Sequence, residues 1–171
     1  ERKYLGGTCV NAGCMPTKTL VASARTAHVA RQAAKYGVVV SGDIGIDMTV
    51  VRGRARDVTL DARTGLETWL GGLEAMSVIY GHARFEDART VTVNAERLTA
   101  PQIFINVGAR PSIPDYPALS DLPNLTSPTI LQLETVPRHP VVIGGRFIGL
   151  EFAQTSRRFG AQVPVVARGS H

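Results

Sequence analysis

The two cysteines of the chain, Cys9 and Cys14, have the residue type and spacing that most clearly suggest chemistry. Positions five apart face different directions on a regular helix, so a disulfide would require a loop or a distorted helix start, which Gly13 and Pro16 permit. A helix N-terminus and the nearby Lys18 would stabilise a thiolate. The spacing leaves three interpretations: a redox pair, half of a zinc site, or two inert buried thiols. No second Cys/His pair completes a zinc site, so no metal site is predicted.

A second motif lies near the end of the chain, where residues 141–151 read VVIGGRFIGLE. An apolar strand followed by glycines and a helical pattern is typical of a dinucleotide-binding turn. The pattern G-x-G-x-x-G is met at Gly144 and Gly149, but Arg146 occupies the position of the middle glycine. That glycine normally lets the backbone approach a pyrophosphate. Arg146 therefore either contacts a phosphate from one side or obstructs the cofactor.

The elements that must position these motifs follow from hydrophobic periodicity and from glycine and proline punctuation. Helices are predicted over residues 17–36, 48–73 and 147–159, with Asp47 as the N-cap of the second. Strands are predicted over residues 38–40, 44–46, 78–80, 90–93, 103–107, 141–143 and 163–166. Residues 108–128 hold five of the ten prolines and are expected to form a surface crossing. The strand, glycine turn, helix and strand of residues 141–166 form a βαβ unit, which indicates an α/β fold.

The composition excludes several classes of protein. With 44% hydrophobic and 19% charged residues in 171, the chain is expected to be globular. No membrane span or signal peptide is visible, so a cytoplasmic protein without a membrane partner is expected. The net charge of +5 does not predict nucleic-acid binding. The densest basic group alternates with acidic residues and is typical of a solvated helix face. It consists of Arg52, Arg54, Arg56 and Arg63. Both ends look truncated, so a piece of a longer chain is expected.

Residues 5–18, LGGTCVNAGCMPTK, resemble the redox-active disulfide motif of the class I pyridine nucleotide-disulfide oxidoreductases. This family includes dihydrolipoamide dehydrogenase, glutathione reductase and mercuric reductase, and the continuation TKTLVASAR is most similar to the mercuric reductase branch. The resemblance implies that Cys9 is the interchange thiol, that Cys14 is the charge-transfer thiolate against the flavin, and that Lys18 lies near the flavin N5. It implies FAD contacts for Glu1, at the adenosine ribose, and for the turn of Gly6, Gly7 and Thr8, at the pyrophosphate.

Two further segments agree with this resemblance. Gly81-His82-Ala83 resembles the segment whose backbone contacts the FAD adenine, whereas His82 on its own would be read as a structural or surface histidine. The sequence INVGARP, residues 105–111, resembles the strand end at which the chain leaves the FAD domain. Gly108 in that segment would let the chain pass close to the flavin dinucleotide.

The second motif extends the resemblance to a nicotinamide cofactor, with Gly144, Gly145 and Gly149 in its turn. Glu151 matches the glutamate that pairs with the flavin lysine, so an ion pair with Lys18 is expected. Phe147 matches an aromatic residue that gates the nicotinamide pocket, with ordinary helix packing as the alternative. An acidic residue at the end of the next strand would bind the ribose of NADH. That position holds Ala167 and is followed by Arg168, which favours NADPH over NADH.

The resemblance implies an α/β protein of three layers with parallel sheets and two incomplete Rossmann-like domains. Residues 1–113 would form part of an FAD-binding domain, and residues 114–171 the start of an NAD(P)-binding domain. The implied reaction passes electrons from NADPH or NADH through FAD to a Cys9–Cys14 disulfide, and on to a small-molecule disulfide or Hg(II). The parent protein would be a homodimer whose partner subunit supplies a His–Glu base, so this piece alone is expected to be inactive. The alternatives are a dihydrolipoamide dehydrogenase, or a flavoprotein-like binding module without reductase activity, which Arg146 and Ala167 would favour.

Overall fold

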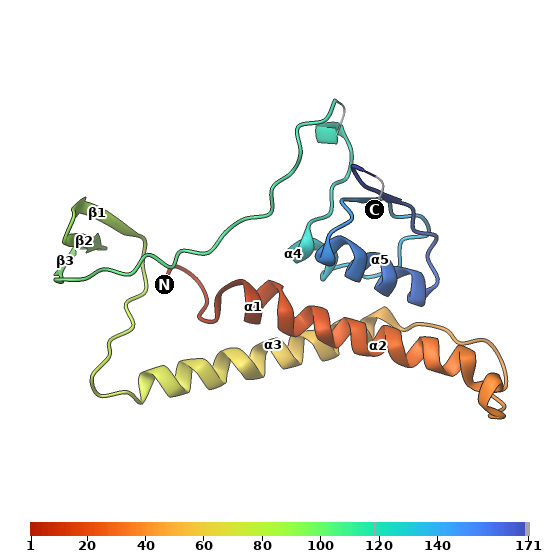
Figure 1. The fold of residues 1–171 in the computed structure, drawn as a ribbon. Helices are drawn as coiled ribbons and strands as arrows, with labels where there is room; N and C mark the ends of the chain where they lie inside the picture. The colour runs from red at the N-terminus through yellow and green to blue at the C-terminus, as the bar shows by residue number, and fades with distance from the viewer. Residues whose placement is uncertain (118, 170–171) are drawn as a thin grey trace.

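The computed structural model describes residues 1–117 and 119–169, which form a mixed arrangement of helices and strands (Figure 1). The elements in chain order are α1 (Gly7–Ala12), α2 (Cys14–Gln32), the 3-10 helix η1 (Ala33–Tyr36), α3 (Met48–Gly71), β1 (Ala83–Asp87), β2 (Thr90–Val93), β3 (Glu96–Thr99), the 3-10 helix η2 (Leu119–Asp121), α4 (Ser127–Ile130), β4 (Val142–Ile143), α5 (Phe147–Phe159) and β5 (Val165–Val166). Among the described residues, no helix has both the length and the apolar character needed to cross a membrane.

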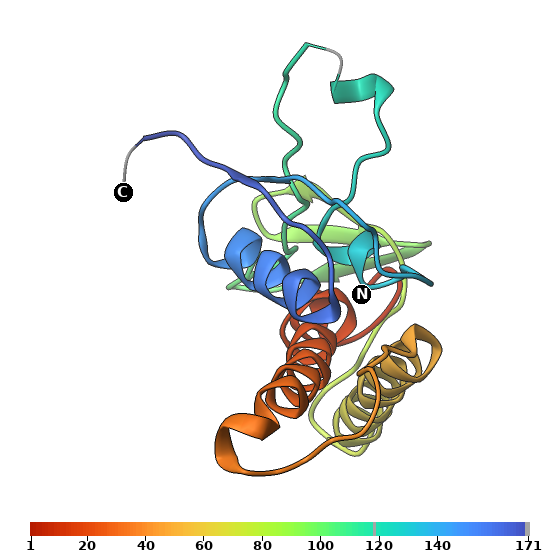
Figure 2. The same cartoon turned by 90° about the vertical axis from the view of Figure 1, so that its right-hand side faces the viewer.

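The core lies where three helices meet. Helix α2 packs along α3 on one side and against α5 on the other, as both views of the ribbon show (Figures 1 and 2). The buried residues that form this core are Leu20, Ala24, Met48, Val51, Ala55 and Phe159. Because these side chains come from α2, α3 and α5, burial of their apolar surface ties the last third of the chain to the first.

The long helix α3 begins where the sequence predicts it. Asp47 has an extended backbone, and its carboxylate oxygen Oδ1 accepts hydrogen bonds from the backbone N–H groups of Thr49 at 2.9 Å and Val50 at 3.2 Å. These bonds satisfy two of the N–H groups that have no partner within the helix. The predicted helices over residues 17–36, 48–73 and 147–159 are thereby confirmed to within a few residues at their ends.

The larger sheet is an antiparallel meander in the order β1-β2-β3. Only its central strand was predicted from the sequence. The predicted strands over residues 38–40, 44–46, 78–80 and 103–107 are wrong: these segments are extended without strand pairing. A short apolar run becomes a strand only where another strand supplies hydrogen-bond partners, and Val39 and Phe104 are both 88% exposed.

The βαβ unit near the C-terminus is confirmed. Strand β4 pairs in parallel with β5, with Val142 opposite Val165 and Ile143 opposite Val166, and α5 connects them. The sequence led us to expect three layers with parallel sheets. Among the described residues, the parallel sheet is this strand pair, and α5 packs against it. An extended segment over residues 100–117 leads from the meander toward η2 and α4 (Figure 1), and its second half begins the predicted crossing over residues 108–128.

Candidate active site

The two cysteines lie on either side of a break between helices. Cys9 is in α1, Cys14 is the first residue of α2, and Gly13 between them has an irregular backbone. A side chain at residue 13 could not be accommodated, because its Cβ would lie 2.8 Å from the carbonyl oxygen of Thr8. The break therefore brings together two thiols that a regular helix would direct apart.

Both cysteines are exposed thiols in this structure. A side-chain hydrogen bond with Cys14 is the main cause of a raised pKa for Cys9, followed by partial desolvation and by the charge on Cys14. Cys9 therefore keeps its proton to a higher pH than an isolated thiol would. The predicted Cys9–Cys14 disulfide would be the oxidised form of this contacting pair.

Lys18 and Glu151 form the ion pair that the sequence predicted. The Lys18 Nζ contacts Glu151 Oε1 across the interface between α2 and α5. The lysine side chain remains 66% exposed and the glutamate 25% exposed, so solvent screens the pair and limits its contribution to stability. Its main effect is geometric, since it fixes the N-terminal half of α5 relative to the helix that begins at Cys14.

The N-terminus lies beside the segment that follows residue 78. The amino group of Glu1 donates to the Ile79 carbonyl at 2.9 Å, and the N–H of Gly81 donates to the Glu1 carbonyl at 2.8 Å. The structure thus brings together two positions that the resemblance assigned to the adenosine end of FAD. The neighbouring His82 and Ala83 are exposed. Gly81 is required sterically, because a Cβ there would lie 2.6 Å from atoms of Asn94 and Val93.

The Glu1 carboxylate is held by its own chain. The backbone N–H groups of Arg2 and Lys3 both donate to Oε1 at 2.8 Å. The bond from Lys3 is the main cause of a lowered pKa for Glu1, with a smaller contribution from Arg2. The carboxylate is thereby held in place beside the start of the chain.

Gly6 and Gly7 form a turn that enters α1 with a left-handed backbone, φ +91° and +55°. A Cβ at Gly6 would come within 2.6 Å of the Val10 Cβ, so glycine is needed there for both conformation and space. Thr8 follows in the first turn of α1 and is exposed. The turn therefore presents backbone and a hydroxyl group at the start of the cysteine motif.

The glycines of the second motif allow close packing of helix on strand. A Cβ at Gly149 would lie 2.3 Å from the Gly144 carbonyl oxygen, and one at Gly145 would lie 2.9 Å from the Ala167 Cβ. Gly144 has φ +113°, which a side chain would disfavour. These three positions therefore need glycine for reasons visible in the structure.

Arg146 and Phe147 stand at the start of α5 with their side chains exposed. Arg146 has an ordinary extended backbone, φ −88° and ψ 174°, which any residue can adopt, so its side chain causes no strain. Phe147 is 77% exposed, so it does not pack against other parts of the described chain. No side chain caps this helix, and its first turn contains no acidic residue.

Gly108, within the extended segment over residues 100–117, and Arg168, close to the end of the described chain, are both exposed. Gly108 has φ +71° and open space around it, and Arg168 follows β5. No hydrogen bond or ion pair within the part of the chain that the structure describes ties either residue to the cysteines. They remain predicted site residues.

The sequence did not single out three residues around the cysteine turn, Tyr4, Asn11 and Arg63. The Arg63 Nε donates to Asn11 Oδ1 at 2.9 Å, and its guanidinium carbon lies 3.9 Å from the centre of the Tyr4 ring. The interpretation of the basic run as a solvated helix face is thus wrong for Arg63. Arg52 is half-buried and pairs with the exposed Glu134, whereas Arg54 contacts Ser23 and is exposed, as that interpretation expects. Only Asn11 carried a sequence signal, by lying between the cysteines.

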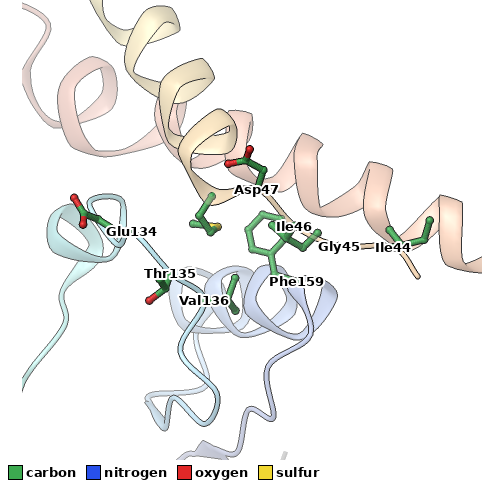
Figure 3. Close-up of a pocket in the computed structure, with 9 residues that line it drawn as sticks. Ile44, Gly45, Ile46, Asp47, Glu134, Thr135, Val136 and Phe159 are labelled. Atoms are coloured by element: carbon green, nitrogen blue, oxygen red, sulfur yellow. The ribbon is translucent and has the colours of Figure 1, made fainter. Parts of the chain in front are cut away.

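A cavity of about 820 Å³ opens elsewhere, between the loop before α3 and the end of α5 (Figure 3). Its lining comes from residues 44–48, residues 134–136 and Phe159, and it includes none of the predicted site residues. Within residues 1–117 and 119–169, no three His, Cys, Asp or Glu side chains cluster as metal ligands would.

Comparison with known proteins identifies the class to which this site belongs. Residues 2–171 match the pyridine nucleotide-disulphide oxidoreductase family, and the chain belongs to that family. It is an α/β protein of the Rossmann-like FAD/NAD(P)-binding class, as the resemblance implied.

Two related proteins and one solved structure illustrate the similarity of this chain to members of the family. The chain is 36% identical to a mercuric reductase of Shigella flexneri over 99% of this chain and 31% of that protein. It is 29% identical to a dihydrolipoyl dehydrogenase of Acholeplasma laidlawii over 97% of this chain and 50% of the relative. The HOCl-induced flavoprotein disulfide reductase RclA from Escherichia coli, in its Cu(II) complex, superposes with a TM-score of 0.80 at 30% identity, covering 97% of this chain and 35% of that one. The chain thus spans about a third of the mercuric reductase and of the reductase RclA.

Proposed function

We propose that this chain supplies the redox-active cysteine pair and parts of both dinucleotide sites of an FAD-dependent NAD(P)H oxidoreductase, most similar to mercuric reductase. The observation that carries the proposal is the break at Gly13, which has Cys9 of α1 on one side and Cys14, the first residue of α2, on the other, in a chain of this family. Residues 1–113 would belong to the FAD-binding domain and residues 114–171 to the NAD(P)-binding domain. The family resemblance supports a homodimer for the whole protein.

The residues present fit both dinucleotides. For FAD, the exposed Glu1 carboxylate lies beside Gly81 and could accept from a ribose hydroxyl, and Lys18 is an exposed cation one turn after Cys14. For the nicotinamide cofactor, the 13-residue helix α5 begins with uncapped N–H groups flanked by the Arg146 side chain, an arrangement suited to a pyrophosphate. The absence of an acidic residue at Ala167 and the presence of Arg168 support NADPH rather than NADH.

The cysteines would carry out thiol–disulfide exchange. The Cys9 thiolate attacks one sulfur of a disulfide substrate and bonds to it, and the other half of the substrate leaves as a thiolate that takes up a proton. Cys14 then attacks Cys9 and forms the Cys9–Cys14 disulfide, which releases the second half of the substrate as a thiol. Bound FAD, reduced by the nicotinamide cofactor, would supply the two electrons that reopen the disulfide.

The hydrogen bond between the thiols adds one requirement to this series of exchange steps. Because it raises the pKa of Cys9, the proton must be removed before Cys9 attacks. The resemblance assigns that task to a His–Glu pair of the partner subunit. Hg(II) as the substrate would instead be bound by the two thiolates and receive the electrons directly.

The test uses the full-length parent protein with its flavin bound. Thiols are counted with a chromogenic disulfide reagent before and after anaerobic addition of NADPH, and long-wavelength absorbance is recorded. We expect two new thiols per chain, an absorbance band that survives Cys9→Ser, and loss of that band in Cys14→Ser. Flavin reduction without new thiols would exclude the cysteines from the electron route.

The same preparation separates the remaining alternatives. We expect NADPH to reduce the flavin at lower concentration than NADH. We also expect Hg(II) to stimulate NADPH consumption more than oxidised lipoamide does. A preference for lipoamide would identify a dihydrolipoamide dehydrogenase. Bound flavin that neither nucleotide reduces would identify a binding module without reductase activity.

A further inference from the structure

We propose that Arg63, on α3, is a positioning residue that holds the cysteine turn in place through Asn11. This inference rests on the proposed redox role of Cys9 and Cys14. It concerns what keeps the two thiols together rather than their chemistry.

Asn11 is the junction of this arrangement. Its side-chain amide donates to the carbonyl oxygens of Leu5 at 2.8 Å and Gly7 at 2.9 Å, so both amide hydrogens are used. Its oxygen Oδ1 accepts from Arg63 Nε at 2.9 Å in a partly buried position. One side chain between the cysteines therefore ties the preceding turn to α3, and the charged donor strengthens the tie.

Helix α3 touches the same turn at two further points. The Arg63 guanidinium carbon lies 3.9 Å from the centre of the Tyr4 ring, an aromatic–cation contact. Leu66 follows on the same face of α3, and its Cδ1 lies 3.0 Å from the place that a Cβ at Gly6 would occupy. The turn over residues 4–7 thus rests against one face of α3.

The turn needs this support because α1 cannot hold itself. It has six residues and no side-chain cap, and it meets α2 through a glycine with irregular backbone. A helix of that length is not stable in isolation. Cys14, by contrast, begins α2, which the core anchors. The separation of Cys9 from Cys14 therefore depends on contacts that α1 makes with α3.

The experiment measures how readily the two thiols close into a disulfide. The full 171-residue chain, whose only cysteines are these two, is equilibrated with reduced and oxidised glutathione. Oxidised glutathione takes two electrons and two protons from the thiols, which gives one protein disulfide and two reduced glutathione molecules. The measured quantity is the equilibrium constant for forming the protein disulfide, here called the closing constant. Arg63→Ala should lower it about threefold to tenfold, the effect of losing one hydrogen bond.

Three further variants make the result specific. Arg56→Ala is the matched control, because Arg56 is exposed on the same helix and pairs with its neighbour Asp57, at 3.3 Å; its closing constant should equal that of the unmodified chain. Arg63→Lys should recover part of the loss. Asn11→Ala should lower the constant at least as much as Arg63→Ala, because it also removes the bonds to Leu5 and Gly7. Adding Arg63→Ala to Asn11→Ala should then cost less than Arg63→Ala costs alone, because the connection between the two is already broken.

The outcomes separate this inference from the proposed function. If the unmodified chain closes its disulfide and Arg63→Ala closes it equally well, Arg63 has no positioning role. Additive losses in the double variant would show that Arg63 does not act through Asn11, and would also overturn the inference. If the unmodified chain forms no disulfide, the proposed redox function itself fails. Far-UV circular dichroism accompanies each variant; should Arg63→Ala unfold, Arg63→Lys and Asn11→Ala decide the matter.

Discussion

At the scale of single residues, the two cysteines are chemically unequal. A side-chain hydrogen bond with Cys14 raises the pKa of Cys9 above the ordinary value of 9.0. A raised pKa means that less of the reactive thiolate is present at any pH below it. Cys9 is therefore an exposed thiol whose reactivity is lowered by its neighbour Cys14.

Replacing Cys14 should release Cys9. In Cys14→Ala the partner sulfur and its charge are removed, so the pKa of Cys9 falls toward 9.0 and its alkylation by iodoacetamide near pH 8 becomes faster. The measurement is the pH dependence of the alkylation rate of the Cys9 peptide by mass spectrometry, on reduced protein. In concentrated urea the two profiles should coincide. Identical profiles in the folded proteins would contradict the thiol–thiol hydrogen bond.

The sequence predicted some contacts between residues and missed others, for a physical reason. The Lys18–Glu151 ion pair could be expected because both residues sit within recognisable motifs. The Arg63–Asn11 bond could not, because Arg63 lies in a basic run whose residues look alike until the packing of α3 against α1 is known. The roles of the predicted site residues toward the cofactors stay predictions.

At the scale of elements, helices were easier to predict than strands. Asp47 and the glycines that end the helices act locally, so their effect is readable from neighbouring residues. A strand depends on a distant partner. The meander shows this, because β1 and β3 have exposed residues along their whole length and no apolar alternation to mark them.

Gly149 should tolerate no side chain, whereas Gly65 should improve with one. A Cβ at residue 149 would lie 2.3 Å from the Gly144 carbonyl oxygen, so Gly149→Ala must displace α5 and should lower the free energy of unfolding by about 1 to 3 kcal/mol. Gly65, inside α3, has no atom within 4 Å of its Cβ position. Gly65→Ala should therefore raise the same free energy by about 0.5 to 1 kcal/mol. Urea titration of both variants checks the opposite signs, and equal effects would contradict the close packing of α5.

At the scale of the whole molecule, the crossing over residues 100–117 exposes an apolar stretch. Phe104 and Val107 are each 88% exposed and Ile105 is 69% exposed, within residues 100–109, which carry no charged side chain. Such a segment is prone to pair with a second copy of itself. The exposed apolar surface thus sets how this chain behaves in concentrated solution.

A single charge in that stretch should reduce association of the 171-residue chain. Ile105→Lys places a cation in the middle of the extended segment, so concentration-dependent light scattering should fall. Tyr36→Lys is the matched control, because Tyr36 is also strongly exposed but lies in the 3-10 helix η1. Equal effects of the two substitutions would mean that net charge, rather than this segment, governs association.

The burial of Phe159 of α5 among residues of α2 and α3 has a thermodynamic consequence. Neither half of the chain can lose its structure without exposing apolar surface that belongs to the other, so the two halves should melt together as one cooperative unit. By linkage, a molecule that binds only at the start of α5 would raise the melting temperature of the whole chain, including the turn that holds Cys9.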